Sequence, residues 1–154
     1  MNQRHFPFFA FFILVITFQP ALCQKVNNSD WIKDVISRSS DQLLSAAETY
    51  KDSLKCPRTF ENGRVKIVGA DDWTSGFFPG SLWDMYEITK NEKFKTEAQR
   101  YTAFLESAKF NKGTHDLGFI LYKSYGNGYR LTGDENYKQI LLTGAKSLLT
   151  RYNS

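Results

Sequence analysis

The chain has very few cysteines. Its 154 residues include two, Cys23 and Cys56. Removal of a leader that ends at Cys23 would leave Cys56 alone, so no internal disulfide could form. Buried free cysteines commonly pack as small apolar residues, and we expect Cys56 to be a structural thiol. Export without disulfides is more typical of a bacterial periplasm than of an animal extracellular space.

Histidine is equally scarce, with His5 and His115 the two in the chain. Histidine, cysteine and aspartate do not cluster at the spacing of a metal site, so we expect neither a metal nor another cofactor. The sequence also lacks a phosphate-binding glycine loop and the turn that presents a nucleophilic serine in hydrolases.

Long hydrophobic runs are missing as well. The longest, Phe6–Phe18, has 13 residues, whereas a helix that crosses a bilayer needs about 20. Charged residues precede it and a short exit with small residues at Ala21 and Cys23 follows it, which is the plan of a secretory signal. We therefore predict a signal peptide over residues 1–23 and a secreted product, in the periplasm of a bacterium. We expect no membrane association of residues 24–154 after cleavage.

Charge excludes one class of partner. The full chain carries 20 Lys and Arg against 16 Asp and Glu, and loss of Arg4 with the signal lowers the net charge from +4 to +3. No basic run accompanies this mild excess, so nucleic acid is not an expected partner. An acidic ligand is compatible with it.

Apolar residues at steps of three and four predict a mainly helical chain. Asp30 is the expected cap of the first helix, Gly126–Gly128 is expected to interrupt the fourth, and Arg64–Val68 alternates like a short strand. The expected helices cover residues 30–54, 81–90, 92–109, 117–125 and 134–152, with a loop over residues 111–115.

The chain also repeats itself. Tyr86–Lys95 matches Tyr129–Lys138 at an offset of 43 residues, and an offset of 42 carries Gly76 onto Gly118. Each unit reads as a loop, an inner helix, a turn and an outer helix. Such helical hairpins must stack to bury their apolar faces, so we predict an all-α stack. Because no polar capping helix follows the last hairpin, we expect the chain to be the front part of a longer protein.

Aromatic residues gather where the loops enter the inner helices. Flat aromatic faces beside carboxylates suit sugars, whose C–H faces stack while their hydroxyls seek charged acceptors. We interpret Trp73, which lies in a glycine-rich loop after Asp72, as a residue that stacks on a ligand. Phe78, Trp83 and Tyr122 are interpreted as core residues instead.

The segment Thr114–Phe119 places Asp116 beside His115 where a loop enters a helix. A loop carboxylate held by a helical scaffold can serve as an acid or base. Aspartate is also a common helix N-cap, and His115 can donate simply to the backbone or to Asp116. Both interpretations stay open on the sequence.

Three segments together resemble glycoside hydrolase family 88, the unsaturated glucuronyl hydrolases. They are Asp72–Trp83, Thr114–Tyr125 and Tyr129–Asp134, in the family's order. The resemblance implies an α/α toroid of six helical hairpins, of which this chain would supply about half. It also implies that residues 24–154 are the N-terminal part of that hydrolase domain.

The resemblance further implies hydration of the C4=C5 enol ether on unsaturated uronic-acid oligosaccharides that polysaccharide lyases leave, of the glycosaminoglycan type. Asp116 corresponds to the first of the family's two catalytic aspartates, while Trp73 and His115 correspond to positions that line the substrate. The second aspartate would lie beyond Ser154, so the fragment alone is expected to be inactive. Alternatives are a non-catalytic helical-repeat protein that binds sugars or partners, and a related hydrolase of pectin-derived unsaturated sugars.

Overall fold

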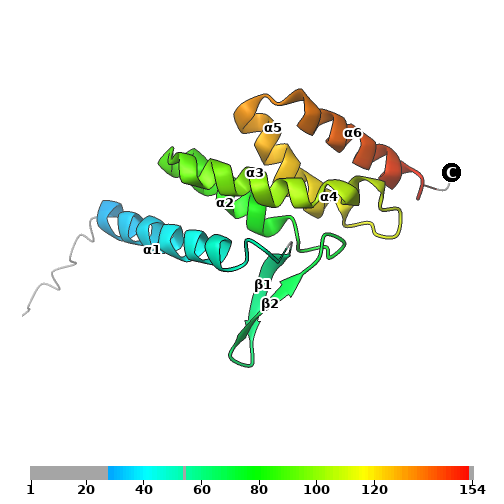
Figure 1. Cartoon of the computed structure of the whole chain (residues 1–154). Coiled ribbons are helices and arrows are strands. Elements are labelled where there is room, and N and C mark those ends of the chain that lie inside the picture. Colours follow the sequence, from blue (N-terminus) through cyan, green and yellow to red (C-terminus); the bar gives the residue numbers. More distant parts are fainter. Residues whose placement is uncertain (1–27, 54, 153–154) are drawn as a thin grey trace, which may run out of the picture.

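The computed structural model describes residues 28–53 and 55–152 (Figure 1), so the predicted signal peptide, with Cys23, lies outside the described residues. None of the helices in this part combines the length and apolar character that crossing a bilayer requires. The elements are α1 (Asn28–Thr49), β1 (Cys56–Glu61), β2 (Arg64–Val68), α2 (Phe77–Thr89), α3 (Glu92–Phe104), the 3-10 helix η1 (Glu106–Phe110), α4 (Leu117–Leu121), the π-helical turn η2 (Tyr122–Gly126), α5 (Asn127–Thr132) and α6 (Glu135–Leu149).

Equivalent hydrogen bonds in two helical hairpins confirm the predicted repeat. The first helical hairpin is α2 with α3, and the second is the run from α4 through α5 with α6. The hydroxyl of Tyr86 donates to Glu92 at 3.2 Å, and that of Tyr129 donates to Glu135 at 3.3 Å. Each bond spans the turn of its hairpin, so the offset of 43 residues describes one structural unit used twice.

The two turns share their caps as well. Lys90 and Gly133 end the inner helices in the left-handed conformation, with φ of 56° and 70°. Asn91 and Asp134 then cap the outer helices, each accepting a hydrogen bond from a backbone N–H two residues on.

The first inner helix begins earlier than the sequence indicates. We expected residues 81–90, but α2 starts at Phe77 and contains Pro79 and Gly80 in its first turn. Proline is tolerated there because the first N–H groups of a helix have no acceptor within the helix.

The expected interruption at Gly126–Gly128 is wrong. Helical structure runs without a break from Leu117 to Thr132, with the π-helical turn in its middle. A Cβ atom at Gly128 would lie 2.6 Å from the ring of Tyr137. Glycine is therefore present at this position because two helices approach closely, and it does not end the helix.

Smaller differences concern the ends of other elements. Asp30 lies in the first turn of α1, which begins at Asn28 and ends at Thr49. The expected helix 92–109 changes to 3-10 geometry at Glu106. The strand Arg64–Val68 is confirmed, and it pairs in antiparallel fashion with β1, which the sequence analysis missed.

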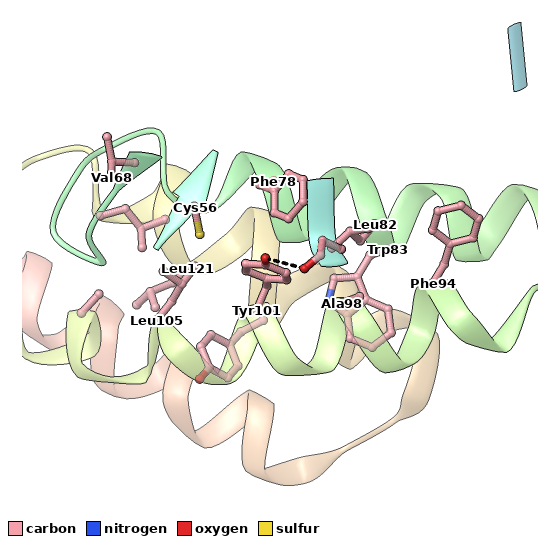
Figure 2. Close-up of a cluster of buried hydrophobic side chains, with 14 of the residues drawn as sticks. Cys56, Val68, Phe78, Leu82, Trp83, Phe94, Ala98, Tyr101, Leu105 and Leu121 are labelled. Atoms are coloured by element: carbon pink, nitrogen blue, oxygen red, sulfur yellow. Dashed lines mark hydrogen bonds between the residues drawn. The ribbon is translucent and has the colours of Figure 1, made fainter. Parts of the chain in front are cut away.

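The core lies between α2 and α3 and extends to the second helical hairpin (Figure 2). The Trp83 indole donates to Thr102 at 3.0 Å, and the Tyr101 hydroxyl donates to the Ala47 carbonyl at 3.0 Å, which ties α1 to α3. Fully or nearly fully buried side chains include Cys56, Leu82, Trp83, Phe94, Ala98, Leu105, Leu117, Ile120 and Tyr125.

Candidate functional site

Two loops that are far apart in the sequence meet at one end of the helical hairpins. The first precedes α2 and carries Trp73, and the second precedes α4 and carries Asp116. A Cβ atom at Gly76 would lie 2.3 Å from the carbonyl oxygens of both Phe119 and Ile120. Only a residue without a side chain allows this contact between the start of α2 and the first turns of α4.

Asp72 orders the loop that carries Trp73. Its carboxylate accepts hydrogen bonds from the backbone N–H and the hydroxyl of Thr74, and a guanidinium N–H of Arg58 donates to it at 2.9 Å. Burial opposes ionisation of this carboxyl, but the bonds from Thr74 and the charges of Arg58 and Lys66 outweigh it and lower the pKa of Asp72. Asp72 is thus a turn residue whose side chain orders its own loop.

Trp73 belongs to an exposed aromatic cluster with Phe77 and Phe119. The ring centroids of Trp73 and Phe77 lie 6.1 Å apart, and Phe119 lies 6.1 Å from Trp73 and 5.9 Å from Phe77. Trp73 keeps 44% of its surface exposed, although it lies among aromatic neighbours. An ordered but uncovered ring of this kind is what stacking on a sugar requires.

Asp116 occupies the N-cap position of α4 without capping it. Its backbone carbonyl accepts from Phe119 N at 2.8 Å, but within the described part of the chain its carboxylate accepts no capping hydrogen bond. Asp134, in contrast, caps α6 through its side chain. The interpretation of the Asp116 side chain as a helix cap is therefore wrong. Its carboxylate is available for another role.

The neighbour of this carboxylate is His115. Its Nε2 lies 3.4 Å from Asp116 Oδ1, with 82% of the histidine side chain exposed and 25% of the aspartate. The Thr114 hydroxyl accepts from Asp116 N at 3.0 Å and so holds the loop in this shape. The partly covered carboxylate is positioned, while the imidazole reaches into solvent.

A hollow of about 430 Å³ opens beside this pair. Its lining includes two basic side chains, His115 and Lys123, and two aromatic rings, Phe119 and Tyr122. Gly118 and Leu148 complete it. Such a lining suits an acidic, ring-shaped ligand.

The structure places His115 beside Asp116, and the Trp73 ring beside that of Phe119 in α4. It adds Phe119, which the sequence analysis did not single out although it follows Asp116 by one helical turn. Phe78 and Trp83 are buried in the core as expected. Tyr122 is not a core residue in the described structure, since 72% of it is exposed.

No group of three or more His, Cys, Asp or Glu residues in the described ranges has the geometry of a metal site.

The stacked helical hairpins place the chain among the all-α toroid folds. Among solved structures, the chain is similar to an unsaturated glucuronyl hydrolase specific for heparin, with a TM-score of 0.78 and 43% identity over 82% of this chain and 34% of that one. An unsaturated glucuronyl hydrolase from Streptococcus agalactiae, solved in complex with dGlcA-GalNAc6S, gives a TM-score of 0.67 at 25% identity, over 79% of this chain and 33% of that one.

Sequence relatives give the same result. The chain is 46% identical to an unsaturated glucuronyl hydrolase of Formosa agariphila over 90 residues, which are 58% of this chain and 22% of that protein. It is 29% identical to an unsaturated chondroitin disaccharide hydrolase of Streptococcus pneumoniae over 127 residues, 78% of this chain and 32% of that protein. No protein-family model matches the chain.

These comparisons confirm the resemblance to the unsaturated glucuronyl hydrolases of glycoside hydrolase family 88, and the all-α fold of that family. The matched part spans between about a fifth and a third of the relatives' own length. This share is smaller than the half that six bare helical hairpins would imply.

Proposed function

We propose that this chain supplies the Asp116 side of the active site of an unsaturated glucuronyl hydrolase. The observation that carries the proposal is the Asp116 carboxylate, which is partly buried, spared from capping, and 3.4 Å from the His115 imidazole. The exposed ring of Trp73 lies on the same end of the fold.

The proposed reaction is hydration of the C4=C5 double bond of a terminal unsaturated uronate. A proton adds at C4 and water adds at C5, and the hemiketal that results opens to release the next sugar. The carboxylate of Asp116 can accept the proton of the attacking water or return one, as general acid–base residues do. Trp73 would hold the sugar ring against the aromatic cluster, and His115 would contact a substituent of the uronate.

The proposed substrates are unsaturated uronic-acid oligosaccharides of the glycosaminoglycan type. One solved relative was crystallised with dGlcA-GalNAc6S, which contains a sulfated amino sugar and supports the glycosaminoglycan type. Another was solved with dGlcA-Glc-Rha-Glc, which supports only the wider class of unsaturated glucuronyl oligosaccharides. The exposed aromatic cluster beside the titratable pair is compatible with either sugar.

A chimera tests the role of Asp116. Residues 57–152 of this chain would replace the matching segment of the Formosa agariphila relative, which supplies the remaining helical hairpins. Turnover is measured as the loss of the enol ether's ultraviolet absorbance. Asp116→Asn should lower kcat by at least about 10²-fold, the lower bound for general acid–base catalysis, with little change in Tm.

Asp134→Asn is the matched control. Asp134 is a true helix cap, and asparagine caps almost as well as aspartate, so both turnover and Tm should persist. Near-normal turnover of Asp116→Asn, or an inactive chimera that folds, would remove the catalytic assignment.

The alternative is a non-catalytic helical-repeat protein. The same chimera separates the two, because a scaffold or binding module would bind the disaccharide without turning it over. The chain by itself is expected to show no turnover, since it matches only about a third or less of its relatives' length.

Export remains a proposal supported by the charged start, the Phe6–Phe18 run and the exit at Ala21 and Cys23. N-terminal sequencing of protein recovered from a bacterial host should begin at Gln24. Recovery of the intact Met1 terminus would overturn the proposal of a secreted, periplasmic product.

A further inference from the structure

The β-hairpin formed by β1 and β2 projects away from the helices (Figure 1). Its base is anchored by Cys56 and Val68, which pair with each other and are buried. Its tip is exposed, with the turn at Asn62 and Gly63 in the left-handed conformation. The core therefore fixes the direction of the β-hairpin while most of its surface faces solvent.

This surface is strongly basic. Between residues 55 and 66 the chain has four cations, Lys55, Arg58, Arg64 and Lys66, and one acid, Glu61. The local excess of three positive charges nearly equals that of the whole chain, +4. Positive charge is thus concentrated on this element.

The basic residues of the β-hairpin begin next to the candidate site. Arg58 binds Asp72 and its guanidinium carbon lies 6.0 Å from the Trp73 ring. Lys66 lies close enough to Asp72 to contribute to the lowered pKa of that carboxyl. Arg64 precedes Lys66 by two residues on the same face of the strand, about 7 Å further from the helices.

The side chains of Arg64 and Lys66 make no hydrogen bond or ion pair among the described residues, although Lys66 is near enough to Asp72 to lower the pKa of that carboxyl. Both side chains are exposed, and a hollow of about 430 Å³ lies along them. Glu61, the cross-strand neighbour of Arg64, also lines this hollow and leaves it with one net positive charge. The neighbouring Arg58, in contrast, is already committed to Asp72. Two unpaired cations on one side of a rigid strand can receive an anion without first breaking an internal bond.

We propose that Arg64 and Lys66 bind an anionic substituent, a sulfate or a carboxylate, on a sugar that follows the uronate held at Trp73. This inference rests on the proposed function, because it takes the oligosaccharide to begin at that site. The β-hairpin then contributes to substrate choice and takes no part in the chemistry. Affinity for anionic sugars would fall as salt screens the two cations.

The test measures binding to the purified chain by calorimetry. The probes are a sulfated unsaturated disaccharide, its unsulfated counterpart, and an unsulfated tetrasaccharide that adds a second carboxylate. For Arg64→Gln/Lys66→Gln we expect affinity for a probe with a second anionic group to fall about tenfold, the scale of losing an exposed charge-assisted hydrogen bond. The unsulfated disaccharide should bind as before.

A matched control removes two exposed cations elsewhere. Lys90→Gln/Lys93→Gln lies at the turn between α2 and α3, at the opposite end of α2 from Trp73. This variant loses the same net charge and should leave all affinities unchanged.

Loss confined to the sulfated disaccharide identifies sulfate, and loss confined to the tetrasaccharide identifies carboxylate. Unchanged affinity for both probes, an equal loss in the control, or no binding of either anionic probe overturns the proposal. Failure of the proposed function has a different signature, since the unsulfated disaccharide would then bind Trp73→Ala as tightly as the unaltered chain.

Discussion

Glu87 and Arg130 form a two-pronged ion pair between consecutive helical hairpins. The two guanidinium nitrogens donate to the two carboxylate oxygens at 2.6 and 2.7 Å. The residues are 43 positions apart, which is the repeat offset, and Asp84 accepts a bond from Asn127 at 3.1 Å with the same separation. Equivalent positions of neighbouring units therefore contact each other, and this relation sets how the hairpins stack.

The ion pair should affect stability only slightly, because both side chains are nearly half exposed. Arg130→Glu places like charges together and should lower Tm, whereas the exchange Glu87→Arg/Arg130→Glu should recover most of the loss. About 1 M salt should reduce both effects. Thermal unfolding of the two variants and the unaltered chain checks this, and an exchange no more stable than Arg130→Glu alone would contradict the pairing.

Gly76 should tolerate no side chain. A Cβ atom there would lie 2.3 Å from the carbonyl oxygens of Phe119 and Ile120, so Gly76→Ala must separate the two helical hairpins. We expect the free energy of unfolding to fall by about 1–3 kcal/mol or more, measured by urea unfolding.

Gly69→Ala is the control for that substitution. A Cβ atom at Gly69 has no neighbour within 4 Å, so stability should stay the same or rise by up to about 1 kcal/mol. Equal losses for the two alanine variants would show that the close contact at Gly76 has no special cost.

Asp72 should make stability depend on pH in the acid range. The pKa of Asp72 is lowered in the folded chain, so its contribution is complete above the unfolded pKa, about 3.9. It is lost as the pH falls through the lower pKa of the folded state. Asp72→Asn should therefore be less stable near neutral pH, and its Tm should approach that of the unaltered chain towards about pH 2. A Tm difference that is independent of pH would contradict this origin.

Cys56 should be unreactive in the folded chain. Burial raises the pKa of its thiol to about 12, so almost no thiolate exists near pH 8. In a Cys23→Ser background, a colorimetric disulfide reagent should label the chain only after unfolding by denaturant. Rapid labelling under native conditions would show that Cys56 is accessible.

Parts of the fold could be predicted because their signals are local. Apolar spacing predicts the helices, the match of Tyr86–Lys95 with Tyr129–Lys138 predicts the repeated helical hairpin, and the alternation of Arg64–Val68 predicts a strand. Gly126–Gly128 predicts a break that is absent, because glycine occurs both at helix breaks and at close helix contacts. Which of the two applies depends on the residues packed against the glycine. At Gly128 these are Tyr137 and Trp83.

The candidate site, like the fold, could be predicted only in part from the sequence. The sequence by itself determined which residue types stand where the loops enter the inner helices, so Trp73, His115 and Asp116 could be selected. Only the tertiary structure decided that these loops meet, through the contact that Gly76 allows. It also decided that the Asp116 carboxylate leaves its own helix uncapped. The physical reason is that the direction of a side chain at a helix start depends on contacts with segments distant in the sequence, which no local pattern records.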